Sequence, residues 1–468
     1  MFSPVSSVVA ELNASFLSGK TLDISWRKEQ LKGLWRLIDE NESRIHEAIV
    51  GDIGKPTVQI QVLEILLVKN DIAFYLEKMD EWLAPESVDV PSPFENWSPT
   101  IHKRPKGTCL IIGTWNYPLV LTMLPLAAVI ACGNTGIVKP SELAPQTATL
   151  LASLFPKYLD PTCFQIINGD KDTAIELLQH PYGHLLYTGG TVIGKQVMQS
   201  AAKHLTPVTL ELGGKNSVVV TEKANVELAA KRISWGKFAI AGQTCFAPNQ
   251  VIVHESVYEQ FIEALKKVSK DFYGDTVEPH KVGKIVNKLH WSRIMSLLES
   301  SKGEIVFGGK GDQENRFIEP TVVKDVQPDD ALLETEIFGP ILPVMKYSTD
   351  AEGKSLLRIL STGALGLYIF SEDMAQAMDI LTWTSAGTAA INDAMGQIAP
   401  TGLPFGGAGD SGMGSYRGRS GIDTFSHRQS VVNVPTAQSF EDMLAWRYPP
   451  MEAPETVKFV KENMEAKI

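Results

Sequence analysis

Hydrophobic positions near the start of the chain follow a helical period. Between Glu11 and Leu83, apolar side chains recur at steps of three and four residues, as in "WRKEQLKGLWRLIDENESRIHEAI". This spacing predicts a run of amphipathic helices. The stretch that follows, "APESVDVPSPFENWSP", is rich in Pro and Ser and predicts a loop or an extended arm.

From about residue 105, short apolar segments alternate with helical ones. The expected strands are "TCLIIGTW" (108–115), "TGIVKPSE" (135–142), "FQIINGD" (164–170) and "HLLYTGG" (184–190). Strand–helix alternation predicts a parallel sheet with helices on both faces. Ligands of such sheets bind at the carboxyl ends of the strands.

A second α/β series begins near Lys215 and continues to about residue 400, and a last strand is expected at 429–434 before a helical tail. The most membrane-like run is "LVLTMLPLAAVIAC" (119–132). It is short for a membrane span and Pro125 interrupts it, so it predicts a buried core helix. The pattern as a whole indicates an α/β protein.

Composition narrows the function class. A chain of 468 residues has room for about two or three domains. The net charge of −11, from 43 basic and 54 acidic residues, argues against nucleic-acid or anionic-membrane binding. The four cysteines form no CxxC pair and no zinc spacing, so we expect reduced thiols and no metal. We find no signal peptide or lipid-anchor signal and expect a soluble cytoplasmic protein.

Cys245 stands in "IAGQTCFAP" (240–248), a segment that indicates a helix-to-strand corner. One interpretation is a buried structural thiol. The other is a nucleophile, which must ionise and would need donors such as the backbone N–H groups of the corner. Small flanking residues favour an accessible thiol, but the loop alone does not decide.

Two further polar residues follow predicted strands. Glu211, in "VTLELGGKN", is either a solvated or capping carboxylate or a base at a strand end beside Gly213 and Gly214, which let another backbone approach. Asn116, in "TWNYP", is either a turn residue before Pro118 or a donor to an oxyanion.

Two motifs suit a nucleotide. "YTGGTVIG" (187–194) places glycines at a strand-to-helix turn, where phosphates bind. "VKPSE" (138–142) sets Lys139 and Glu142 at a strand end. They are either a surface ion pair or a ribose clamp whose acid would repel a 2′-phosphate.

These stretches occur in one chain and in one order, with "EIFGPILPV" (336–344) and "LPFGGAGDSGMGSY" (403–416) after them. In this combination the sequence resembles the aldehyde dehydrogenase superfamily, and within it the class 3 and fatty-aldehyde branch. The resemblance covers nearly the whole chain, from "SGKT" near residue 18 to "RYPP" at 447–450.

The resemblance implies two doubly wound, Rossmann-like parallel-sheet domains and a small β oligomerisation arm. Residues 1–83 and 104–212 would form the NAD(P)-binding domain, and residues 213–400 the catalytic domain. Residues 84–103 and 415–440 would form an arm that pairs across a homodimer interface. Residues 441–468 would be a C-terminal tail.

The resemblance also implies a mechanism and a cofactor. Cys245 would attack an aldehyde to form a thiohemiacetal, with Asn116 and the Cys245 backbone N–H holding the oxyanion. Hydride transfer would leave a thioester, and Glu211 would activate the water that hydrolyses it. NAD is expected, with NADP as an alternative. The implied cofactor residues are Lys139 and Glu142 at the adenosine ribose, Gly189 and Gly194 beside the pyrophosphate with Gly190 in the same cradle, and Glu336 and Phe338 at the nicotinamide ribose.

By the same resemblance, Tyr117, Thr244 and Phe405 would line a pocket for medium-chain or aromatic aldehydes. The sequence departs from the family at four positions near that pocket, namely Ile240, Gln397, Thr401 and Arg417. Because guanidinium pairs well with carboxylate, one hypothesis is that Arg417 reads an acidic group on the substrate. The alternative is that it points to solvent or forms a structural pair.

Two other functions remain open at this point. Acyl transfer to CoA or phosphate is one, and retention of the hydrolytic base Glu211 argues against it. A catalytically silent structural or binding protein is the other. The presence of Cys245, Glu211, Asn116 and Lys139 together argues against that loss of activity.

Overall fold

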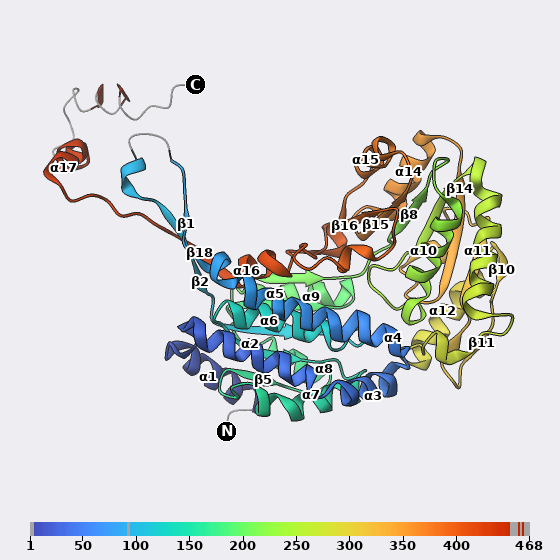
Figure 1. Cartoon of the computed structure of the whole chain (residues 1–468), viewed down its shortest axis with the longest axis horizontal. Coiled ribbons are helices and arrows are strands. Elements are labelled where there is room, and N and C mark those ends of the chain that lie inside the picture. The colour runs from blue at the N-terminus through green and yellow to red at the C-terminus, as the bar shows by residue number, and fades with distance from the viewer. Residues whose placement is uncertain (1–3, 91–93, 450–456, 459–460, 463–468) are drawn as a thin grey trace.

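The computed structural model describes residues 4–90, 94–449, 457–458 and 461–462. Two α/β bodies stand side by side, and an arm projects from the first of them (Figure 1). Much of the expected tail, including the last residue of "RYPP", lies outside the described residues. Within the described residues, no helix is long and apolar enough to cross a membrane.

The first body is built on a six-stranded sheet of order β17-β7-β6-β3-β4-β5, parallel except where β17 runs against β7. Its strands are β3 Thr108–Ile112, β4 Thr135–Lys139, β5 Phe164–Ile166, β6 His184–Thr188, β7 Val208–Glu211 and β17 Gly412–Met413. Its helices are α1 Pro4–Leu17, α2 Ile24–Asp39, α3 Glu42–Ile53, α4 Thr57–Ile60, α5 Leu66–Leu83, α6 Val120–Ala131, α7 Pro145–Tyr158, α8 Lys171–Leu177, α9 Thr191–Ala202 and α16 Gly418–Phe425.

The apolar run at 119–132 forms helix α6, and every residue of α6 is buried. A helix that is hydrophobic on all sides belongs inside a protein, so the prediction of a core helix is confirmed. The return of α16 to the first body was not predicted, because the sequence analysis places residues 415–440 in the arm as one block. Strand β17 falls between residues 400 and 415, a stretch for which no domain was predicted.

The second body has a seven-stranded sheet of order β10-β13-β14-β9-β8-β15-β16, parallel except at β10. Its central strands are apolar on both faces, as buried parallel strands are. The strands are β8 Ser217–Val220, β9 Gln250–His254, β10 Glu304–Phe307, β13 Thr321–Lys324, β14 Ile341–Tyr347, β15 Ala364–Phe370 and β16 Ala386–Ile391, with a hairpin of β11 Gly311–Asp312 and β12 Phe317–Ile318. The helices are α10 Val226–Phe238, α11 Tyr258–Tyr273, α12 Lys288–Ser300, α13 Ala331–Glu334, α14 Asp350–Ser361 and α15 Met374–Leu381. The expected α/β fold with two Rossmann-like bodies is confirmed.

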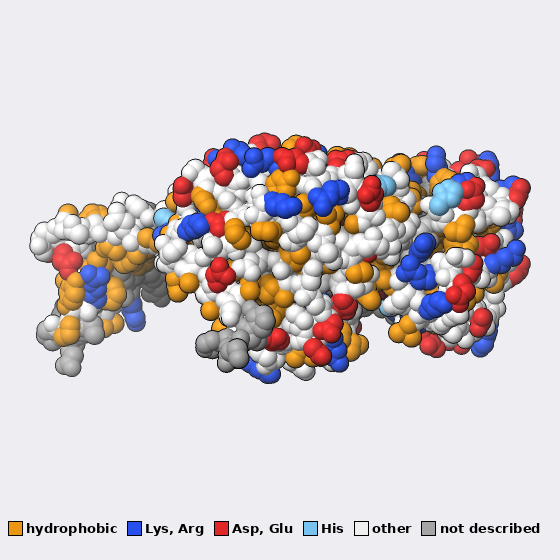
Figure 2. All heavy atoms as spheres, turned by 90° about the horizontal axis from the view of Figure 1, so that it is seen from below, with side chains coloured by type: hydrophobic (Ala, Val, Ile, Leu, Met, Phe, Trp, Pro, Cys, Tyr) orange, Lys and Arg blue, Asp and Glu red, His pale blue; other side chains and the backbone are white. Residues whose placement is uncertain are grey.

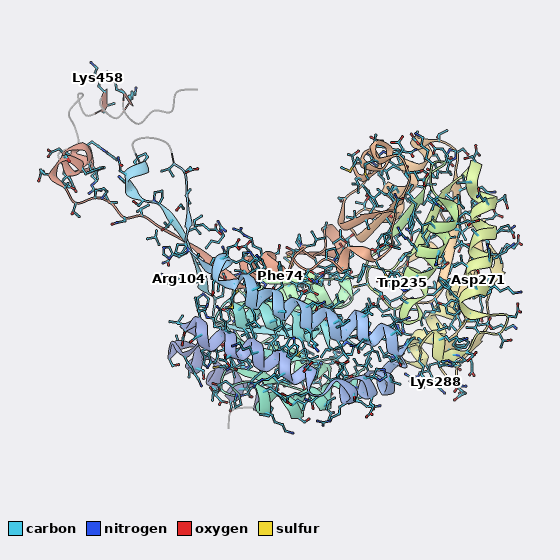
Figure 3. All side chains as sticks on the ribbon, in the orientation of Figure 1. Phe74, Arg104, Trp235, Asp271, Lys288 and Lys458 are labelled. Carbon is cyan, nitrogen blue, oxygen red and sulfur yellow. The ribbon has the colours of Figure 1, made fainter. Side chains whose placement is uncertain are left out.

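The arm is a three-stranded antiparallel sheet of order β1-β2-β18, with β1 at Glu86–Ser87, β2 at Thr100–Pro105 and β18 at Ser426–Val431. Helix α17, Gln438–Leu444, lies at its far end (Figure 1). Strands β2 and β18 of the two arm segments pair with each other within one chain, and the expected pairing across a homodimer interface stays a prediction. Arg104, at the base of the arm in Figure 3, donates from Nε to Gln429 Oε1 at 2.9 Å across this pair.

The last strand begins and ends three residues earlier than the apolar letters predicted. Its ladder with β2 ends where Val431 faces Thr100. The residue before Thr100 is Pro99, which has no N–H to extend the ladder. The pairing partner, rather than the local hydrophobic pattern, therefore sets the end of β18.

The side chains on the face seen in Figure 2 carry charges of both signs in an interspersed pattern. The excess of acidic residues is therefore not gathered into one block on that face. No extended stripe of Lys and Arg is visible there that could track a phosphate backbone.

Candidate active site

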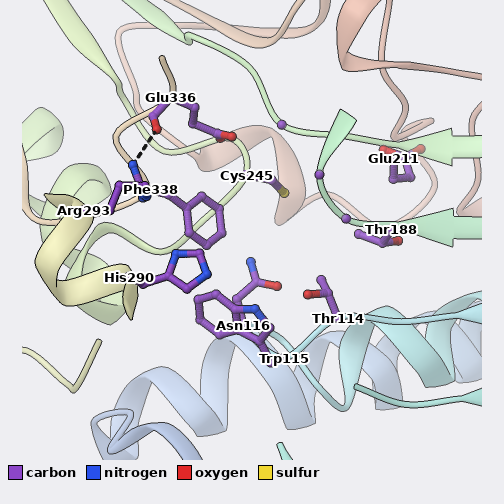
Figure 4. Close-up of a pocket in the computed structure, with 13 residues that line it drawn as sticks. Thr114, Trp115, Asn116, Thr188, Glu211, Cys245, His290, Arg293, Glu336 and Phe338 are labelled. Carbon is purple, nitrogen blue, oxygen red and sulfur yellow. Dashed lines mark hydrogen bonds between the residues drawn. The ribbon is translucent and has the colours of Figure 1, made fainter. Parts of the chain in front are cut away.

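A cavity of about 310 Å³ lies where strands of the first sheet end and face the second body. Figure 4 shows it in close-up. Its lining residues are Thr114, Trp115, Asn116, Thr188, Gly189, Gly190, Glu211, Gly213, Cys245, His290, Arg293, Glu336 and Phe338. The nucleophile, amide and carboxylate predicted from sequence thus line one cavity.

Cys245 lies on the expected corner. Helix α10 ends at Phe238, and after Ala239 the three residues Ile240, Ala241 and Gly242 all adopt the left-handed conformation, with φ of 43°, 53° and 72°. A Cβ at Gly242 would lie 2.2 Å from the carbonyl oxygen of Gly339. Only glycine fits there, so this turn fixes the path of the chain into the loop that holds the half-buried Cys245 thiol.

Two side chains of the second body hold that loop in place, one from the residue before β8 and one from β15. Asn216 Nδ2 donates to the carbonyl oxygens of Cys245 and Ala247, each at 2.9 Å. The hydroxyl of Tyr368 donates to the carbonyl oxygen of Phe246. With its carbonyls occupied in this way, the peptide around the sulfur is rigidly held.

The electrostatics of the cavity keep the free thiol protonated. Burial raises the pKa of Cys245 above its ordinary value, and the nearby carboxyl groups of Glu336 and Glu211 raise it further. Backbone N–H groups of Cys245 and Phe246 lower it, as the sequence analysis required, but burial outweighs them.

Glu211 ends strand β7, whose neighbour β17 pairs Gly412 with it. Its backbone carbonyl accepts the N–H of Gly189 at 3.0 Å, which joins the two strand ends. Its side chain is buried, and among the described residues neither carboxyl oxygen has a hydrogen-bond partner. Burial raises the pKa of Glu211 well above its ordinary value, toward the range where a carboxylate is an effective base.

Asn116 follows β3 and faces the cysteine loop. Its Nδ2 donates to the carbonyl oxygen of Gln243 at 3.0 Å, and its Oδ1 has no partner among the described residues. An amide NH₂ group carries two hydrogens, so one donor remains for a ligand.

The glycines of "YTGGTVIG" lie in two different surroundings. Gly189 and Gly190 line the cavity, and a Cβ at Gly190 would meet nothing within 4 Å, so the space beside it is open. A Cβ at Gly189 would lie 2.2 Å from the hydroxyl of Tyr187. Gly194 lies inside α9, where a Cβ would be 2.7 Å from Leu212, so the helix packs closely on the residue that follows β7. Its expected place beside a pyrophosphate stays a prediction.

Glu142 lines a separate cavity, and Lys139 forms an ion pair with it. The buried Lys139 ammonium donates to Glu142 Oε2 at 3.0 Å and to the Pro140 carbonyl at 3.1 Å. Glu142 is half exposed and lines a space of about 190 Å³ with Asn168 and Gly169. The ion pair and the clamp interpretations are thus compatible: the lysine orients a carboxylate that still faces an open space.

The wall opposite Glu211 holds Glu336 and Phe338 together with two residues that the sequence analysis missed, His290 and Arg293 (Figure 4). Both come from the first turns of α12, three residues apart and so on one helix face. Burial raises the pKa of Glu336 to about 7. The spacing "HWSR" was a usable signal only after α12 had been placed beside the cavity.

The four residues proposed for a substrate pocket do not line this cavity, as far as the described residues show. Tyr117 and Thr244 join their hydroxyls at 2.9 Å, and Phe405 is buried against Phe246 with ring centroids 5.4 Å apart. For Tyr117, Thr244 and Phe405, a place in a substrate pocket stays a prediction.

Arg417 requires a correction. Its guanidinium is buried and pairs with both oxygens of Asp71, Nε to Oδ2 at 2.9 Å and Nη2 to Oδ1 at 2.7 Å. Nη1 donates to the Ile398 carbonyl at 2.6 Å. Two nitrogens form the structural pair that was the alternative hypothesis and the third is held by a backbone carbonyl, so Arg417 does not read an acidic substrate.

The cavity suits a dinucleotide. Thr188 Oγ1 and Glu336 Oε1 are buried without a hydrogen-bond partner in the described part of the chain, and the glycine turn leaves open space beside them. Unpartnered buried polar atoms are costly and mark a site that a ligand completes. The residues present therefore fit NAD or NADP.

Comparison with known proteins identifies the family. The model of the aldehyde dehydrogenase family matches residues 4–431. This chain belongs to the aldehyde dehydrogenase family. It is 39% identical over 449 residues to the dog protein named "Aldehyde dehydrogenase, dimeric NADP-preferring", across 96% of this chain and 98% of that one. It is 41% identical over 420 residues to the Staphylococcus aureus "4,4'-diaponeurosporen-aldehyde dehydrogenase", across 90% and 91%.

Further likenesses place this aldehyde dehydrogenase within the family. It is 39% identical over 443 residues to "Aldehyde dehydrogenase family 3 member A2" of Pongo abelii, across 94% of this chain and 90% of the relative. The solved structure "Substrate bound state of Staphylococcus Aureus AldH" matches with a TM-score of 0.93 at 38% identity, across 99% and 100% of the two chains. The expected class 3 branch and an NAD(P)-dependent aldehyde dehydrogenase are confirmed.

Proposed function

We propose that this enzyme converts an aldehyde to a carboxylic acid through a thiohemiacetal and a thioester on Cys245. The observation that carries the proposal is the convergence of three chemically different groups on one cavity. A half-buried thiol, an amide with a free hydrogen, and an unpaired carboxyl group line it together. They come from distant parts of the chain, and each has the chemistry that one step requires.

In the first step, the Cys245 thiol gives its proton to solvent water and its sulfur bonds to the aldehyde carbon. The carbonyl electron pair moves to oxygen, which becomes an oxyanion. The second amide hydrogen of Asn116 and the backbone N–H of Cys245 are the proposed donors to it. The loss of one such donor typically lowers the rate by about 10²–10³-fold.

In the later steps, NAD(P), when it is bound, supplies a positively charged nicotinamide that accepts a hydride. Cys245 is then left as a thioester. Glu211 takes a proton from water, the resulting hydroxide attacks the thioester carbon, and the C–S bond breaks to release the acid. The Cys245 sulfur then takes the proton back from Glu211 and becomes a thiol again. The raised pKa of Glu211 favours this role, because a stronger base removes the proton more readily.

For the cofactor, Lys139 and Glu142 are the proposed contacts of the adenosine ribose, and Glu336 with Phe338 those of the nicotinamide ribose. Glu142 would repel a 2′-phosphate, whereas the dog relative is named NADP-preferring. We expect Glu142→Gln to raise kcat/KM with NADP relative to NAD. A ratio that does not change would show that Glu142 does not face the 2′ position.

A spectrophotometric assay tests the activity. NAD(P)H absorbance is followed with hexanal or benzaldehyde, with and without CoA, and the acid product is quantified. We expect NAD(P)H and free acid in equal amounts, and no effect of CoA. Formation of an acyl-CoA would favour acyl transfer instead, and no turnover of any aldehyde by folded protein would favour a silent scaffold.

The assembly and location are part of the proposal. The dog relative is named dimeric, and the projecting arm gives this chain a surface beyond its two α/β bodies. We propose a homodimer in the cytoplasm. Light scattering is expected to give about twice the 51.3 kDa chain mass, and a monomer mass would contradict the dimer.

A further inference from the structure

One short segment touches both halves of the catalytic cavity. It runs from Lys55 through α4 and the π-helical turn Gln61–Ile65, and ends where α5 begins. In Figure 1, α4 lies where the first body meets the second. Single π turns inside helices are frequent at functional sites. We define this stretch, residues 55–65, as the brace segment.

At its two ends the brace segment holds a buried ion pair. The ammonium of Lys55 and the carboxylate of Glu64 contact each other, and both side chains are fully buried. Lys55 Nζ also donates to the backbone carbonyl oxygen of Asn116 at 3.0 Å. The same ammonium lies 4.0 Å from the ring centroid of Tyr117, in a cation–π contact.

The second oxygen of Glu64 completes the arrangement. Glu64 Oε2 accepts the backbone N–H groups of Leu119 at 3.2 Å and Val120 at 3.0 Å, at the start of α6. A negative charge is favourable at a helix N-terminus. Lys55 and Glu64 therefore fix the backbone on both sides of the turn that presents the Asn116 amide.

The middle of the brace segment reaches the other half of the site. Gln59 Oε1 accepts the N–H of Ile240 at 2.9 Å. Ile240 is the first left-handed residue of the corner that carries Cys245. One segment thus contacts both the chain that bears the amide and the chain that bears the thiol.

We propose that Lys55 and Glu64 are positioning residues that hold the Asn116 amide against the oxyanion formed at Cys245. The inference rests on the proposed roles of Asn116 and Cys245. Stability alone does not explain the pair, because hydrophobic residues of similar volume often replace a buried ion pair at no cost. The pair also fixes the orientation of the Asn116 turn, because its hydrogen bonds go to the backbone of that turn.

The test is a kinetic comparison with a double variant. Burial lowers the pKa of Lys55 and raises that of Glu64, so removing one partner would leave the other poorly compensated. Lys55→Met/Glu64→Leu removes both. We expect kcat to fall about 10- to 100-fold while the KM values for aldehyde and cofactor change less than about 3-fold. Lys20→Met/Asp160→Asn removes a pair in the same domain and is expected to leave kcat unchanged.

A double-mutant cycle separates positioning from a general structural effect. In an Asn116→Ala background the same double variant is expected to lower kcat by less than about 3-fold, because the group that it positions is already gone. Full additivity of the two losses overturns the proposal, and so does an unchanged kcat in the folded double variant. If that variant does not fold, Glu64→Gln, which keeps the shape of the side chain, is analysed by the same cycle.

The same experiment distinguishes failure of this inference from failure of the proposed function. An active parent enzyme that needs Cys245 but is indifferent to Lys55 and Glu64 overturns the inference alone. A folded parent enzyme that oxidises no aldehyde, or a Cys245→Ala variant that does so at the parent rate, overturns the proposed function and the inference with it.

Discussion

Replacing Glu211 by leucine is expected to stabilise the protein while removing its activity. The carboxyl group is buried, and neither oxygen has a hydrogen-bond partner among the described residues. An unsatisfied buried polar group costs about 1–3 kcal/mol. We therefore expect Glu211→Leu to raise the free energy of unfolding by about 1–3 kcal/mol at about pH 8. General-base catalysis is worth about 10²–10⁴-fold, which sets the expected loss of kcat.

The stabilisation expected for Glu211→Leu depends on pH. The pKa of Glu211 is raised in the folded protein above its ordinary value of 4.5. Above pH 4.5 the folded state therefore binds more protons than the unfolded state, so rising pH destabilises the parent protein until the folded-state pKa is passed. The advantage of Glu211→Leu should accordingly grow with pH, by at most about 1.4 kcal/mol per pH unit.

Urea unfolding, followed by fluorescence of the nine tryptophans, measures the free energy of unfolding of the parent and of Glu211→Leu at several values from about pH 5 to pH 8. Glu47→Gln, at an exposed position, is the matched control and should change stability by less than about 0.5 kcal/mol. A Glu211→Leu protein that is less stable than the parent at every pH would refute the reasoning. It would mean that the carboxylate is paired or hydrated in the folded state.

Three other substitutions or modifications have expected outcomes. Gly242→Ala should abolish soluble expression or cost more than about 3 kcal/mol, because its Cβ would lie 2.2 Å from Gly339 O, and a normal melting curve would contradict this. Arg417→Met should lower the free energy of unfolding in urea by about 3–5 kcal/mol, because it leaves Asp71 as a buried unpaired charge. Adding Asp71→Leu should restore most of the lost stability. A single variant as stable as the parent would be the contrary result. Alkylation of Cys245 by iodoacetamide, followed by peptide mass spectrometry, should accelerate about tenfold per pH unit below about pH 9, whereas a flat profile would show a thiolate already formed.

The parts of the fold that sequence predicted are those with a strong local signal. Helix α6 is apolar on all sides, and β3 lies within the apolar letters of 108–115, so each is recognisable from the sequence. The Cys245 corner was readable from the glycine before it and Pro248 after it. The run of three left-handed residues in this corner could not be predicted, because Ile240 is β-branched and such residues rarely adopt positive φ.

What escaped prediction depends on contacts between distant residues. Asp71 and Arg417 are 346 positions apart, so nothing near Arg417 in the sequence reveals its partner. Lys55 and Glu64 read as two ordinary charges in a helical stretch, and only the fold shows them fully buried beneath the Asn116 turn. His290 likewise lines the cavity only because the fold packs α12 against it, which its neighbours in the sequence do not reveal.

The central claim is that the aldehyde carbon becomes bonded to one sulfur before water releases it. The most direct measurement is peptide mass spectrometry of Glu211→Gln protein after mixing with hexanal and NAD(P). The account predicts an acyl group on the peptide that contains Cys245, accompanied by a burst of reduced cofactor and slow release of acid. An unmodified Cys245 peptide, together with acid formation by Cys245→Ala at the parent rate, would contradict it.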